Sequence, residues 1–204
     1  MLSIILALSL IAGPDHNRPQ TGDLIFEIAT DSEMSQAITE ATAADAPVKF
    51  SHVGIIEIDD NGNISVIEAT GKYGVVINPL DTFMNKAKAG AVIKRLDIDY
   101  PIKDTIGRAK SHLGKGYDWW YLPDNEEIYC SELVEKSYLN ADGTSIFPTI
   151  PMNFRDNDGN MPQFWTDLFN KLGRPIPEGI QGTNPTQISQ SKLLRHICTL
   201  PKEQ

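Results

Sequence analysis

The chain has 204 residues, 41% of them hydrophobic, and a formal net charge of −9. This length fits one domain, or one domain with an appended tail, and the apolar content is sufficient for a proper core. The chain has a net negative charge and no basic cluster. This composition argues against nucleic acid as a partner and against simple electrostatic binding to anionic membranes.

Residues 1–13 are almost wholly apolar. They are too few for a transmembrane helix, which needs about 20 apolar residues, so no transmembrane segment is predicted. Their length suits the core of a signal peptide, with Ala12 and Gly13 as small residues near a cleavage point, although no Lys or Arg precedes Arg18. We therefore expect an apolar leader and export to the periplasm or the outside; without such a leader the protein would be cytoplasmic.

The remaining residues, 14–204, are predicted to form a single domain. Short β-rich runs follow one another closely, and amphipathic runs indicate helices beside them, which predicts an α+β fold with an antiparallel sheet and helices packed on one side. From about residue 147 prolines and glycines punctuate the chain, so we expect an extended wrap around the core there. The predicted strands lie near residues 24–29, 52–58, 63–69, 75–77 and 91–96, and the predicted helices near 32–42, 80–88, 102–113, 131–139 and 162–172.

A hairpin is predicted where Asp60-Asn61-Gly62 separates two β-rich runs. If Gly62 takes the left-handed position, Asp59 faces Asn63, and pairing back along the strands places Gly54 opposite Glu68. His52 and Glu68 would then be diagonal neighbours on one face. A loop one residue shorter or longer would put them on opposite faces.

An aromatic run, Trp119-Trp120-Tyr121, follows the dipeptide Tyr117-Asp118, and Trp165 lies in the proline-rich tail. In a cleft these side chains would form an apolar wall for an acyl chain or an apolar side chain. Packing between helices is the competing interpretation.

Cys130 stands where a helix is predicted to begin. Unpaired backbone N–H groups and the positive end of the helix dipole favour a thiolate at such a position and predispose it to act as a nucleophile. The competing interpretation is a buried core cysteine. The second cysteine, Cys198, is then a spare in a C-terminal packing segment, and a disulfide between the two would remove the nucleophile.

Together, Cys130, His52 and Glu68 supply the parts of thiol catalysis. Cys130 would attack an acyl carbon, His52 would take and return the proton, and Glu68 would hold the imidazole tautomer. The same three residues are competent zinc ligands, but their spacing matches no recognised zinc pattern. We therefore expect no metal and no cofactor.

Six short stretches carry a resemblance to a known family. The chain resembles the circularly permuted branch of the NlpC/P60 papain-like superfamily, the YiiX/YaeF-type permuted amidases. The stretches appear in the family's order over more than half of the chain. They are residues 21–26 (TGDLIF), 51–55 (SHVGI), 66–69 (VIEA), 74–75 (GV), 113–118 (LGKGYD) and 129–134 (YCSELV).

This resemblance implies a papain-like fold with permuted chain order, in which His52 and Glu68 precede Cys130. Lecithin-retinol-acyltransferase-like relatives often carry a second histidine as third member, whereas Glu68 fits the YiiX/YaeF type. Tyr117 matches the family's Tyr-Asp dipeptide and is a candidate oxyanion or substrate contact, with plain packing as the competing interpretation. Ser131 is a further candidate for such a contact, beside the backbone amide of Cys130.

Three functions follow from these observations. The first is a cysteine amidase or peptidase that cleaves an amide of a cell-wall peptide or a lipid-bearing substrate through a thioester on Cys130. The second is an acyltransferase of the lecithin-retinol-acyltransferase-like kind, and the third a non-catalytic protein that binds a lipid or peptide in the same cleft. The sequence leaves the oligomeric state open.

Overall fold

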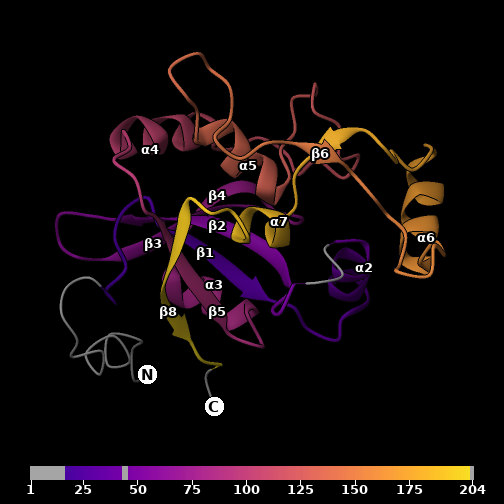
Figure 1. Ribbon diagram of the computed structural model, residues 1–204, viewed down its shortest axis with the longest axis horizontal. Coiled ribbons are helices and arrows are strands. Elements are labelled where there is room, and N and C mark those ends of the chain that lie inside the picture. The colour runs from indigo at the N-terminus through magenta and orange to yellow at the C-terminus, as the bar shows by residue number, and fades with distance from the viewer. Residues whose placement is uncertain (1–16, 43–45, 203–204) are drawn as a thin grey trace.

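Six strands form one antiparallel sheet within residues 17–42 and 46–202, the part of the chain that the computed structural model describes (Figure 1). The strand order across the sheet is β4-β3-β2-β1-β5-β8. The expected leader at residues 1–13 lies outside the described residues. The strands are β1 (Leu24–Ile28), β2 (Phe50–Ile58), β3 (Ile64–Thr70), β4 (Gly74–Pro79), β5 (Ala91–Leu96) and β8 (Leu194–Leu200).

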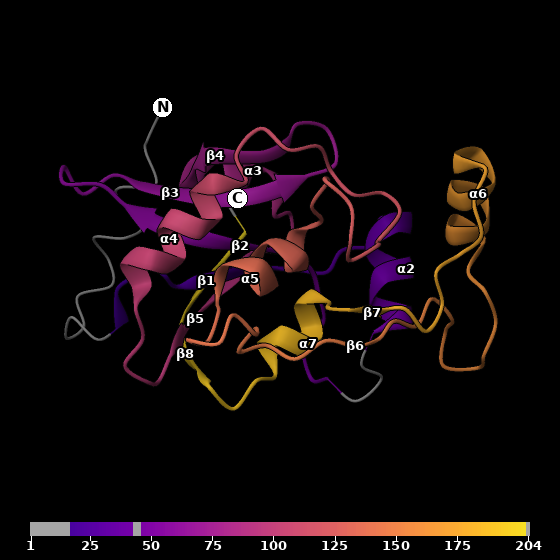
Figure 2. The same cartoon turned by 90° about the horizontal axis from the view of Figure 1, so that it is seen from above.

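Helices cover both faces of this sheet. In β1, Leu24 and Phe26 point into a core shared with α4 and α5, whereas Ile25 points into a second core under α3. Figure 2 looks onto the first layer, where α4 and α5 cross the strands. The α+β fold with an antiparallel sheet is confirmed, with α3 as a helix on the opposite face. The helices are α2 (Glu33–Ala41), α3 (Leu80–Lys86), α4 (Ile102–Ser111), α5 (Cys130–Ser137), α6 (Gln163–Leu172) and α7 (Pro185–Ser189).

The predicted β2–β3 hairpin is present with the expected register. The N–H of Asp59 donates to the carbonyl oxygen of Asn63 at 3.1 Å, and Gly62 has a φ of 81°. Pairing runs from Ile58 with Ile64 to Ile55 with Ile67, and a Cβ on Gly54 would lie 3.4 Å from that of Glu68. His52 and Glu68 consequently share the face of the sheet that α3 covers.

The C-terminal segment returns to the sheet after passing over the helices. Its strand β6 (Ile150–Pro151) pairs with β7 (Gln181–Gly182), and α6 lies beside α2 at one end of the molecule (Figures 1 and 2). β8 then pairs with β5 at the edge of the sheet. We expected only a packing segment there, because the strand depends on pairing with the distant β5, which no local pattern indicates. No helix in the described part of the chain is long and apolar enough to cross a membrane.

Candidate active site

Cys130 is the first residue of α5, as the sequence predicted. The helix begins here because Tyr129 is extended and its N–H donates to Oε2 of Glu132 at 3.2 Å, while its carbonyl accepts from the N–H of Leu133. Cys130 is buried, with 6% of its surface exposed. Its thiol therefore lies against the first helical turn, where N–H groups lack intrahelical partners.

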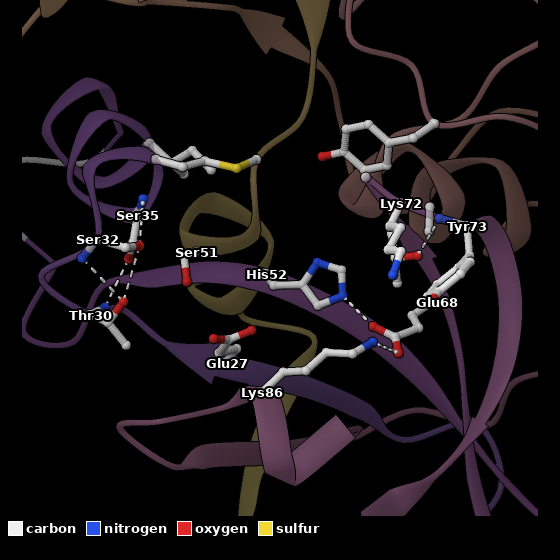
Figure 3. A pocket seen from close by; sticks show the side chains of 16 residues that line it. Glu27, Thr30, Ser32, Ser35, Ser51, His52, Glu68, Lys72, Tyr73 and Lys86 are labelled. Carbon is white, nitrogen blue, oxygen red and sulfur yellow. Dashed lines mark hydrogen bonds and ion pairs between the residues drawn. The ribbon is translucent and has the colours of Figure 1, made fainter. Parts of the chain in front are cut away.

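His52 and Glu68 form a hydrogen-bonded pair (Figure 3). Nε2 of His52 lies 2.7 Å from Oε2 of Glu68, whose side chain is 1% exposed. The other carboxylate oxygen accepts from Nδ2 of Asn78 at 2.6 Å and lies 3.5 Å from Nζ of Lys86. Burial alone would raise the pKa of Glu68, but its bond to His52, the amide of Asn78 and the charge of Lys86 lower it to about 2. The carboxylate is therefore ionised and fixed.

The imidazole of His52 is hydrogen-bonded to this carboxylate and also interacts with Cys130. Burial would lower the pKa of His52, but hydrogen bonding to Cys130 and to Glu68 raises it well above the ordinary value. Since Nε2 is engaged by Glu68, Nδ1 remains for the thiol. The ring of Phe83 stacks on the imidazole at 5.9 Å between centroids and limits its rotation.

Two pockets meet at the Cys130–His52 pair. We call them the histidine-side pocket, about 340 Å³, which contains His52 and Glu68, and the cysteine-side pocket, about 110 Å³, which contains Cys130. Polar side chains dominate the first pocket (Figure 3), whereas aromatic and aliphatic side chains together make up much of the lining of the second. The residues that line both pockets are Ile38, Ser51 and Tyr117.

Comparison with known proteins identifies the family of this chain. Residues 18–198 match the family described as permuted papain-like amidase enzyme, YaeF/YiiX, C92 family. The chain belongs to this family. The uncharacterized protein YiiX of Escherichia coli K12 is 32% identical in an alignment of 181 residues that covers 87% of this chain and 83% of YiiX. A crystal structure described as that of the metalloprotein YiiX from Escherichia coli O157:H7 is 30% identical, with a TM-score of 0.69. The match covers 91% of this chain and 98% of that one.

Tyr117 lies at the boundary of the two pockets in this member of the permuted papain-like amidase family. It is buried, and burial together with the nearby Tyr121 and Cys130 raises the pKa of its hydroxyl well above the ordinary value. Its hydroxyl therefore stays protonated and can donate a hydrogen bond. The other candidate, Ser131, is placed differently, because its Oγ donates to the backbone oxygen of Thr183 at 3.0 Å. That bond joins the start of α5 to the C-terminal segment, and Ser131 also lines the cysteine-side pocket.

The three tryptophans expected in a cleft wall occupy different places. Trp165 lines the cysteine-side pocket. Trp119 lines neither pocket, and its ring packs on Tyr117 at 4.8 Å between centroids. Trp120 lies in a separate hollow, where the guanidinium of Arg174 covers its ring at 3.8 Å. An aromatic wall is present, but it consists of Trp165 with tyrosines and Phe154.

Sequence reasoning missed Asn78 and Lys86, the two side chains that contact Oε1 of Glu68. Asn78 pairs with Val66 across β3 and β4, so it is a diagonal neighbour of Glu68. The same register argument, carried one hairpin further from the Gly74 turn, would have found it. Lys86 at the end of α3 approaches only through tertiary packing, which no local pattern indicates.

Proposed function

We propose that the protein is a cysteine amidase or peptidase with Cys130 as nucleophile. The observation that supports this proposal is the 2.7 Å hydrogen bond between Nε2 of His52 and Oε2 of the ionised Glu68, together with the effect of Cys130 on the pKa of His52. The family supports an amidase-type activity, and the assignment of roles to these residues is our own.

In the first half-reaction Sγ of Cys130 attacks the acyl carbon and its proton passes to His52. The N–H of Cys130 at the helix start and the hydroxyl of Tyr117 stabilise the oxyanion. His52 then protonates the leaving amine, the C–N bond breaks, and a thioester remains on Cys130. Glu68 stabilises the imidazolium through both steps.

In the second half-reaction His52 accepts a proton from water as the water oxygen attacks the thioester. The C–S bond breaks, the acid leaves, and His52 returns the proton to Cys130. In this scheme the acyl group occupies the cysteine-side pocket and the amine the histidine-side pocket. A small peptide, a cell-wall fragment or a lipid-bearing amide meets this description.

The word metalloprotein attached to the solved YiiX structure raises the question of a metal here. In residues 17–42 and 46–202 no three His, Cys, Asp or Glu side chains are grouped to hold one. Both oxygens of Glu68 are already engaged, one of them by Lys86, and an ammonium group opposes a cation at that place. The donor set does not fit a metal, and no step is assigned to one. Elemental analysis of the purified protein tests this, since stoichiometric zinc would require other roles for His52 and Glu68.

The decisive experiment is the alkylation rate of Cys130 by iodoacetamide against pH, with Cys198→Ser as background. We expect fast alkylation at pH 6–7, well below the range where an ordinary thiol reacts, and loss of that behaviour in His52→Ala. Ordinary thiol behaviour in both proteins would contradict the proposal and favour a non-catalytic binding protein. Transfer of the acyl product to an added amine in place of water would identify an acyltransferase.

We also propose that residues 1–13 direct export. Their apolar composition carries this proposal. Mass spectrometry of the protein from separated periplasmic and cytoplasmic fractions tests it, and an intact N-terminus confined to the cytoplasm would contradict it.

A further inference from the structure

The cysteine-side pocket contains two hydroxyl groups without hydrogen-bond partners. Among the described residues, no hydrogen bond of ordinary geometry reaches Tyr121 Oη or Thr183 Oγ1, although these residues are only 8% and 3% exposed and the hydroxyls of Tyr117 and Tyr129 interact with them weakly from nearby. A buried polar group left unpaired costs about 1–3 kcal/mol, and native proteins contain few of them. Two in the pocket that holds Cys130 require an explanation.

Tyr121 is held in an unfavourable backbone conformation. Its φ is 54°, in the left-handed region that bulky residues rarely adopt. The carboxylate of the buried Asp118 accepts from the N–H of Trp120 at 2.7 Å and of Leu122 at 2.8 Å, and so fixes both neighbours. The ring of Trp165 packs edge-on against Tyr121 at 5.7 Å. Strain that the surroundings impose in this way is typical of functional sites.

Thr183 is held through its backbone from the start of α5. Its N–H donates to Oη of Tyr129 at 3.2 Å, and its carbonyl oxygen accepts from Oγ of Ser131 at 3.0 Å. These two residues flank Cys130 directly. The position of Thr183 relative to the nucleophile is therefore fixed, while its side-chain hydroxyl remains unpaired.

The pocket has the size of a short group. Its volume is about 110 Å³, and a cavity of about 150 Å³ is large enough for benzene. Trp165 and Phe154 supply apolar walls, and the two hydroxyls supply donors and acceptors. A plain alkyl chain would leave both hydroxyls unpaired, and a long one exceeds this volume. A short acyl group with an amide near the reacting carbonyl, as in a peptidyl or N-acylaminoacyl group, fits the volume and can hydrogen-bond the two hydroxyls.

We propose that Tyr121 and Thr183 are specificity-determining residues, whose hydroxyls hydrogen-bond an amide in a short acyl group next to Cys130. This inference rests on the proposed function, because it assigns the acyl portion of the substrate to the cysteine-side pocket.

The test uses two activated esters of equal chain length, p-nitrophenyl N-acetylglycinate and p-nitrophenyl pentanoate. In either reaction Sγ of Cys130 forms the thioester, its proton passes to His52, and p-nitrophenolate leaves with the electrons of the broken C–O bond. The rate is measured from the burst of p-nitrophenolate with Cys198→Ser as background. Division by the rate with N-acetylcysteine removes the intrinsic difference between the esters.

We expect the protein to prefer the acetamido ester by roughly tenfold or more after this correction. Tyr121→Phe and Thr183→Val should each reduce the preference for the acetamido ester over the pentanoate about 3–10-fold. Tyr100→Phe is the matched control, because its hydroxyl is bonded to the carbonyl of Leu139 outside both pockets. It should change neither rate.

A stability measurement separates specificity from structure. Because the Tyr121 hydroxyl is unpaired, Tyr121→Phe should keep or raise the urea midpoint, whereas a structural hydroxyl would lower it. Equal slowing of both esters, or no preference in the unsubstituted protein, would overturn the inference and leave the proposed function standing. No burst with either ester would remove the proposed function and this inference with it.

Discussion

At the scale of single residues, Glu68 is the most constrained side chain of the site. Its two oxygens face the imidazole of His52, the amide of Asn78 and the ammonium of Lys86. A carboxylate held in this way cannot rotate away while the imidazole gains and loses its proton. Its contribution is therefore electrostatic as well as geometric.

Substitutions in the proposed triad should differ in severity. Cys130→Ala and His52→Ala should abolish amide turnover while the protein stays folded. Glu68→Gln keeps an oxygen acceptor but removes the charge that stabilises the imidazolium, so we expect a loss of about 10–100-fold, smaller than for the other two. Turnover of a peptide amide with matched circular dichroism spectra measures this. Full activity in Glu68→Gln would remove Glu68 from the mechanism.

Glu132 gives a prediction on pH dependence. Burial raises its pKa to about 7, against the opposing charge of Lys136 and the bond from the N–H of Tyr129. Its ordinary pKa is 4.5, so between these values the folded protein holds a proton that the unfolded chain releases. The contribution of Glu132 to the free energy of unfolding is therefore fully present below pH 4.5 and is lost as the pH rises through about 7.

Glu132→Gln should remove this decline, because an amide oxygen still accepts from Tyr129 and carries no charge. We expect no change in the free energy of unfolding at pH 4 and a gain of about 1–3 kcal/mol at pH 8. Urea unfolding at both pH values measures it, with the exposed Glu40→Gln as control. An equal effect at pH 4 and pH 8 would show that the charge of Glu132 is not responsible.

At the scale of elements, two glycines allow backbone strain to be separated from packing. Gly62 in the β2–β3 loop has a φ of 81°, whereas Gly107 lies inside α4, and an added Cβ would meet nothing within 4 Å at either. Gly62→Ala should therefore destabilise by about 1 kcal/mol, and Gly107→Ala should stabilise by about 0.5–1 kcal/mol. Urea midpoints measure both, and neither variant should alter Cys130 alkylation. If both substitutions changed the free energy of unfolding in the same direction, backbone conformational preference would not explain their effects.

The hairpin also shows what the sequence can predict. The two β-rich runs and the turn signal at Asn61-Gly62 lie close together in the chain. They were therefore sufficient to predict the register that brings His52 beside Glu68. The helix start at Cys130 was local too. In contrast, β8 depends on pairing with β5 across the fold, and Tyr121 depends on a carboxylate that bends the chain around it. Such features arise from tertiary contacts, and no periodicity indicates them.

At the scale of the whole molecule, the site is assembled from segments far apart in the chain. The sheet supplies His52 and Glu68, α5 supplies Cys130, and the C-terminal segment supplies Trp165 and Thr183 to the cysteine-side pocket. The C-terminal wrap therefore takes part in the site, and its closing strand β8 secures it to the sheet beside β5.

A buried ion pair connects the start of β1 to β5 and supports this assembly. Nε of Arg95 lies 2.6 Å from Oδ1 of Asp23 and Nη2 lies 2.8 Å from Oδ2, with Asp23 1% exposed. Nη2 also donates to the carbonyl oxygen of Arg18. Burial raises the pKa of Asp23 even with Arg95 in place, so the carboxylate depends on its partner to remain charged.

Arg95→Met should destabilise the protein by about 3–5 kcal/mol at pH 7, because it leaves Asp23 buried and unpaired. The double variant Asp23→Asn with Arg95→Met should recover part of that loss, since an amide tolerates burial better than a lone carboxylate. The single variant should also recover as the pH falls and Asp23 becomes protonated. Urea unfolding of both variants at pH 5 and pH 7 measures these effects. If the double variant were less stable than Arg95→Met at pH 7, the packing of the two side chains, and not the charge of Asp23, would hold β1 to β5.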